Sequence, residues 1–122
     1  MALEPVASLP PRAVDVCERV VTALPDELAP DVARRVTAPP STATAAWGEP
    51  PVTLRCGTEP GSRRDDLYEL DGVLWAMHDS GDSRTWTTVA AKVPVQVVVP
   101  DVYSDQAEML GSLAVALRPA LR

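Results

Sequence analysis

The stretch of sequence that decides the fold is Trp47-Gly48-Glu49-Pro50-Pro51-Val52-Thr53-Leu54-Arg55-Cys56-Gly57. Its proline pair imposes an extended backbone, because the residue before a proline is driven out of the helical region. After the prolines, apolar and polar residues alternate from Val52 to Cys56, which is the period of a half-buried strand. Cys56 therefore points to the same side as Val52 and Leu54, toward the core.

The other cysteine, Cys17, lies on a predicted helix over residues 12–24. Apolar residues recur there at the spacing of one helical face, namely Val14, Cys17, Val21 and Leu24. Pro25 ends the helix, because proline does not continue it. Two cysteines that point inward from different elements are either disulfide partners or two free buried thiols, and the residues alone leave both alternatives open.

The segment between this helix and Trp47 is predicted to be irregular and rich in proline. Within residues 25–46, only Val32 and Val36 suggest regular structure, as the ends of a short helical turn over residues 31–35. A stretch of about twenty residues without regular structure is unusual in a compact domain, unless anchors hold it down. Trp47 is the predicted anchor.

The rest of the chain predicts strands followed by a helix. The strands are expected over residues 67–70, 73–78, 84–90 and 94–99. Asp71-Gly72 predicts a type I′ turn between the first two of them. Ser104 is the predicted N-cap of the last helix, which carries a continuous apolar stripe made of Leu110, Leu113, Ala114, Leu117 and Leu121.

These elements predict an α+β fold. Short connections between consecutive strands favour a mostly antiparallel sheet of four to five strands. The N-terminal and the C-terminal helix are expected to pack on one face of that sheet, because each must bury its apolar side. Residues 1–11 are predicted to form an extended arm, the remnant of a linker to a removed anchor, and residues 12–122 a single domain.

Charge and hydropathy argue against several functions. The formal net charge is −6 and no basic stripe is present, which argues against nucleic acid and against a polybasic membrane contact. No apolar run approaches the ~20 residues that a membrane-spanning helix needs. The first residues lack the features of a signal peptide, so the chain is either cytosolic or a form whose leader or anchor has been removed.

His78 is the only histidine, and it lies beside Asp79 at the end of a predicted strand. Such a pair suits a general base with its orienting carboxylate, and Asp82 follows three residues later. No serine or cysteine in a nucleophile-elbow context accompanies them, and the acids lack the spacing of a calcium loop. We expect no catalytic residue, no metal and no cofactor. The alternative is a small envelope hydrolase or metal-dependent enzyme that uses His78 and the neighbouring acids.

The aromatic residues allow two interpretations. Because the chain has no Phe, its three Trp and two Tyr supply all the aromatic bulk, and Trp75 can pair with Trp86 across the sheet. They are either core and loop-pinning residues or part of a groove for a sugar or peptide. The candidate binding surface consists of Trp47, Glu49, Tyr68, Trp75 and Trp86, with Tyr103 as a further aromatic residue.

The block from Thr44 to Gly57 resembles the domain of unknown function 3515 family of actinobacterial proteins, which carries the pattern T-A-A-W-G-[DE]-P-P-V-x-L-R-C-G. The resemblance covers nearly the whole chain, from Cys17 through residues 95–100. It implies a domain outside the cytoplasmic membrane, secreted or held by an N-terminal hydrophobic or lipoprotein-like segment. That setting favours a disulfide between Cys17 and Cys56, whereas the family brings no catalytic residues.

The sequence and the resemblance together predict a non-enzymatic domain of the cell envelope that binds a protein, peptide or glycan. The candidate surface is the proline-rich loop of residues 39–51 around Trp47, because loops on a rigid sheet often carry function. A third hypothesis is a structural stabiliser of a larger membrane complex. Contact with a membrane is expected only through an N-terminal anchor that the chain lacks.

Overall fold

The computed structural model describes residues 11–30, 32–35 and 43–121, which form one antiparallel sheet and three helices. The helices are α1 (Pro11–Ala23), α2 (Gln106–Gly111) and α3 (Ala114–Leu121). The strands are β1 (Glu27–Ala29), β2 (Val32–Arg35), β3 (Thr44–Trp47), β4 (Val52–Cys56), β5 (Asp66–Leu70), β6 (Val73–Asp79), β7 (Ser83–Thr88) and β8 (Val95–Pro100). The predicted α+β class is therefore confirmed.

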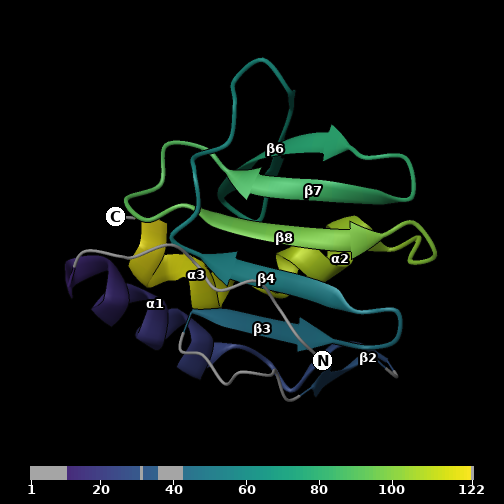
Figure 1. The fold of residues 1–122 in the computed structure, drawn as a ribbon, viewed down its shortest axis with the longest axis horizontal. Helices are drawn as coiled ribbons and strands as arrows, with labels where there is room; N and C mark the ends of the chain where they lie inside the picture. Colours follow the sequence, from purple (N-terminus) through teal and green to yellow (C-terminus); the bar gives the residue numbers. More distant parts are fainter. Residues whose placement is uncertain (1–10, 31, 36–42, 122) are drawn as a thin grey trace.

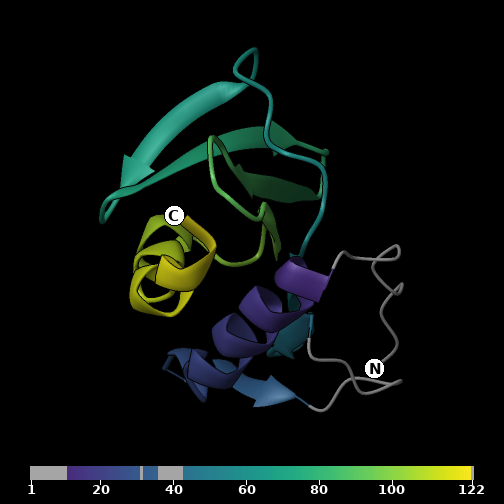
Figure 2. The same cartoon turned by 90° about the vertical axis from the view of Figure 1, so that its left-hand side faces the viewer.

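The sheet runs in the order β1-β2-β3-β4-β8-β7-β6-β5, and every neighbouring pair is antiparallel (Figure 1). The three helices lie on one side of the sheet, and the sheet curves around them (Figure 2). One hydrophobic core joins the inner faces of α1, α2 and α3 to the inward side chains of the strands. Both ends of the described chain thus pack on the same face, as predicted.

The opening block forms the centre of the sheet. Trp47 pairs with Val52 across the tight connection from β3 to β4, and both side chains are fully buried. The alternation predicted for β4 is confirmed, because Leu54 and Cys56 also point into the core while the residues between them are half-exposed. In β8 the same alternation buries its valines at positions 95, 97 and 99.

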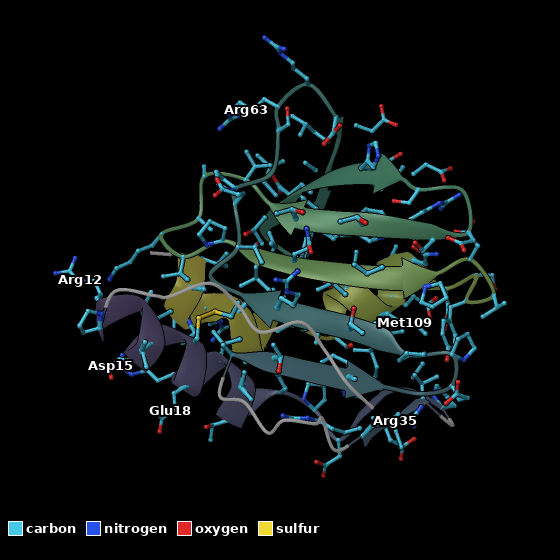
Figure 3. The ribbon with its side chains drawn as sticks, in the orientation of Figure 1. Arg12, Asp15, Glu18, Arg35, Arg63 and Met109 are labelled. Atoms are coloured by element: carbon cyan, nitrogen blue, oxygen red, sulfur yellow. A yellow bond between two sulfur atoms is a disulfide. The ribbon has the colours of Figure 1, made fainter. Side chains whose placement is uncertain are left out.

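Cys17 and Cys56 form a disulfide that joins α1 to the middle of the sheet (Figure 3, yellow bond). Their Cα atoms are 5.7 Å apart, within the usual range for such a bond. The pairing expected from the family resemblance is therefore confirmed.

The buried face of α1 differs from the predicted one. The buried residues are Ala13, Val16, Cys17, Val20 and Val21, and Leu24 beyond the helix end is buried too, whereas Val14 is 40% exposed. Cys17, Val21 and Leu24 are buried as predicted, and the prediction was wrong only for Val14, because a valine-rich helix offers two overlapping apolar stripes. Packing then favours the wider stripe, which leaves Val14 outside.

The sheet has eight strands, and the prediction of four to five was wrong. The missing strands β1, β2 and β3 lie in the segment that was expected to be irregular, and β2 replaces the predicted helical turn. Strands of three or four residues contain too few positions to show a clear alternation. In β3, moreover, all four side chains are buried, including the polar Thr44, so buried and exposed positions do not alternate.

The last helix is broken, where an unbroken one was expected. α2 ends at Gly111 and α3 begins at Ala114, and at the break Ser112 Oγ donates to the carbonyl oxygen of Met109 at 2.7 Å. The predicted N-cap at Ser104 was also wrong, because Asp105 precedes α2 and its side chain makes no capping bond. The apolar stripe itself is largely confirmed, since Leu110, Leu113 and Leu117 are fully buried.

Two further expectations concern short segments. The type I′ turn between β5 and β6 is confirmed, because Asp71 and Gly72 have φ angles of 51° and 84°. Of the predicted arm over residues 1–11, residues 1–10 lie outside the described part of the chain, and Pro11 is already the first residue of α1.

Candidate functional site

The three indoles of the predicted binding surface are buried in the core. Trp47, Trp75 and Trp86 are each at most 4% exposed. Trp47 Nε1 donates to the carbonyl oxygen of Pro25 at 3.0 Å and so holds the start of the segment before β1. Trp86 Nε1 donates to Gln106 Oε1 at 2.9 Å. For these three residues the core interpretation is confirmed, and they do not line an open groove.

The sequence suggested that Trp75 and Trp86 pair across the sheet, but they do not lie opposite each other. In the register of β6 and β7, Trp75 lies opposite Thr88, whereas Trp86 lies opposite Met77. Trp86 instead meets the ring of Tyr68 edge-on, with ring centroids 5.4 Å apart. Tyr68 and Glu49 are the two members of the candidate surface that remain exposed.

The turn from β3 to β4 is held by side chains from two distant elements. Tyr103 Oη donates to the carbonyl oxygen of Pro50 at 2.7 Å. Arg35 from β2 donates to the carbonyl oxygen of Gly48 at 3.1 Å and forms an ion pair with Glu49. The candidate loop of residues 39–51 is therefore a pinned structural turn in its second half, and residues 39–42 lie outside the described part.

Gly48 is required in this turn for two reasons, and Gly48→Ala is expected to destabilise the protein by about 1–3 kcal/mol. Its φ angle is 73°, a backbone conformation that residues with a side chain rarely adopt. An added Cβ would also lie 2.6 Å from Tyr103 Oη. Chemical denaturation measures the loss. Gly72→Ala is the matched control, because Gly72 has a φ angle of 84° but nothing within 4 Å of the added Cβ. Equal losses in both variants would contradict a role for the close approach.

His78 does not form the pair with Asp79 that the alternative enzyme hypothesis requires. Adjacent residues of a strand point to opposite faces, and His78 Nδ1 lies 3.9 Å from Asp65 Oδ1 instead, with 68% of its side chain exposed. The carboxylate of Asp79 accepts a hydrogen bond from the backbone N–H of Gly81 at 2.9 Å, which is turn chemistry. Within the described ranges, no group of three or more His, Cys, Asp or Glu residues is placed to hold a metal ion.

The free edge of the sheet at β5 was missed by the sequence reasoning. β5 is the terminal strand, so it pairs only with β6. Leu67 and Tyr68, at its middle, are 41% and 42% exposed, and they are the only two large exposed hydrophobic residues of the described chain that are adjacent in sequence. The residues themselves predicted a strand here, but only the strand order shows that its outer side is unpaired.

A cleft of about 660 Å³ opens where the β5–β6 turn meets α2 and α3. Its lining consists of Asp71, Gly72, Val73, Gly111, Ala114, Val115, Arg118 and Leu121. Gly111 lets the carboxylate of Asp71 approach the helix backbone, because a Cβ at that position would collide with it. The cleft combines one carboxylate and one guanidinium with apolar side chains and lies at the end of the exposed edge.

The disulfide between Cys17 and Cys56 bears on the location of the domain. A disulfide that closes a 39-residue separation is typical of oxidising compartments outside the cytosol. No helix in residues 11–30, 32–35 or 43–121 has both the length and the apolar character to cross a bilayer.

Comparison with curated proteins and with solved structures finds no match. A family model does match, over residues 1–121, and it describes a protein of unknown function (DUF3515). The match includes the block around Trp47 that carries the resemblance. The chain therefore belongs to the DUF3515 family.

Proposed function

We propose that this chain is a non-enzymatic, extracytoplasmic domain of the cell envelope that binds a partner protein. The observation that carries the proposal is the open edge of the sheet at β5. There, unpaired backbone groups lie beside two adjacent exposed hydrophobic side chains, Leu67 and Tyr68. Such an edge is a ready template for another chain.

The opposite edge of the sheet supports this assignment by contrast. β1 has only three residues, its register with β2 is irregular between Glu27 and Ala29, and prolines lie on either side at Pro25 and Pro30. Short strands, irregular pairing and prolines are the usual protections of an edge. β5 has neither a proline nor a lysine and is five residues long, so it is the edge that is suited to a partner.

The location in the envelope rests on the disulfide and on membership of the family. Cys17 and Cys56 are at most 1% exposed, so their bond belongs to the folded core. A bond of this kind persists where thiols are not kept reduced, which supports a compartment outside the cytoplasm. Secretion and anchoring are alternatives within the same proposal.

Photo-crosslinking in cells tests the proposed function. A photoreactive amino acid at position 67 of the full-length protein is expected to give a discrete adduct with another protein. The same amino acid at position 14 is the matched control, because Val14 on α1 is as exposed as Leu67 but lies on a helix. A band from position 67 alone supports binding at the β5 edge. Equal labelling from both positions, or none from either, would contradict it.

A further inference from the structure

We propose that β5 binds an extended, positively charged segment of the partner protein as an additional strand of the sheet. This inference rests on the proposed function and specifies the partner by its chemistry. It combines the outward hydrogen-bonding groups of β5, the acidic residues that flank them and the exposure of Leu67 and Tyr68.

The pairing of β5 with β6 determines which backbone groups face outward. Leu70 and Val73 flank the two-residue turn, so they exchange backbone hydrogen bonds, and the exchange recurs at every second residue. Tyr68 therefore also bonds to β6. Leu67 and Glu69 lie between these pairs, so their N–H and C=O groups point away from β6 and are available to an added strand.

The side chains along this edge carry negative charge. From residue 65 to residue 70 the chain has three acids and no basic residue, namely Asp65, Asp66 and Glu69. The nearest arginine pair precedes this run, and Arg63 projects from the tip of the preceding loop, away from the strands (Figure 3). A strand with lysine or arginine side chains would gain opposite-charge pairs across the ladder.

The same charges argue against a second copy of this chain as the occupant. Two β5 strands side by side would bring acidic side chains opposite each other, and like charges across a ladder are destabilising. A cationic strand can hydrogen-bond to the outward backbone groups of β5 without that repulsion. The edge therefore selects a partner that is both extended and basic.

The test uses a short synthetic peptide in which lysine alternates with valine, and a glutamate–valine peptide of equal length. The protein is expected to bind the lysine peptide, and its amides at Leu67 and Glu69 should become protected from hydrogen exchange. Titration calorimetry measures the affinity. Binding should weaken with added salt, because exposed charges are screened.

Two variants separate backbone pairing from general charge attraction. Glu69→Lys should lower the affinity about tenfold, because it replaces an attractive cross-strand pair by a repulsive one. Glu18→Lys makes the same charge change at an exposed position of α1 (Figure 3), and α1 lies far from the β5–β6 hairpin (Figure 2), so this variant should leave the affinity unchanged. Leu67→Pro should lower it about fivefold, because it removes one outward donor at an edge position where proline is tolerated.

The outcomes are decisive in both directions. Protection at Leu67 and Glu69, with loss in Glu69→Lys and not in Glu18→Lys, supports the inference. Equal weakening by both charge reversals, equal binding of the glutamate peptide, or no binding at all would overturn it. If the peptide fails while position 67 still crosslinks to a protein in cells, the interaction function stands and the cationic strand does not.

Discussion

Replacement of both Cys17 and Cys56 by alanine is expected to lower the free energy of unfolding by about 4 kcal/mol. The bond constrains a 39-residue separation, and removing it restores that much conformational freedom to the unfolded chain. Small domains are stable by only about 5–15 kcal/mol, so the loss is a large fraction of the total. Denaturant titration of the double variant against the wild type measures it.

Alanine is the right replacement because both side chains are in the core. Each cysteine is at most 1% exposed, so a serine would bury a hydroxyl and add a penalty unrelated to the bond. The wild-type protein under reductant is the second measurement and should lose a similar amount. Thiol titration of the denatured, unreduced protein should find no free thiol. Two thiols per chain, or a loss well below 1 kcal/mol, would contradict a stabilising disulfide.

The parts of the fold that were predicted from sequence are those whose signal is local. The strand from Val52 to Cys56 shows its alternation over five residues, and Asp71-Gly72 meets the positive φ requirement of its turn. The inward direction of Cys56 followed from that alternation. Its pairing with Cys17 needed the family resemblance, because no spacing rule distinguishes a bond from two buried thiols.

The parts that failed depend on packing between distant segments. β2 contains two arginines in four residues, and its strand form depends on pairing with β1 and β3 rather than on its own composition. No proline marks the break after Gly111, whereas Pro119 lies inside α3. Local propensity is weak at such positions, and tertiary contacts override it.

The candidate site was predicted only in part, and for the same reason. The sequence left open whether the aromatic residues form the core or a groove, and burial separates Trp47 and Trp75 from the exposed Tyr68. The open edge at β5 follows from the strand order, since β8 lies between β4 and β7 and leaves the hairpin outermost. Because the predicted strands have similar lengths, the sequence does not indicate which of them lies at the edge of the sheet.

Leu113→Ala is expected to destabilise the protein by about 2–5 kcal/mol, as truncations of buried leucines do. Leu113 is fully buried at the break between α2 and α3, where the chain turns against the inner face of the sheet. Because it lies between the helices, the change in helix propensity contributes little. The measured loss reports packing and the cavity left behind.

Val115→Ala, two residues later, provides the control. Val115 is 66% exposed on α3, so its truncation should change stability by less than about 0.5 kcal/mol. A large loss at Leu113 with almost none at Val115 requires that this face of the C-terminal segment be packed on the sheet. If both variants were neutral, the segment would not hold the core together. The β5–β6 hairpin, which curves over α2 and α3 (Figure 2), would then lack the support that keeps its edge in place for a partner.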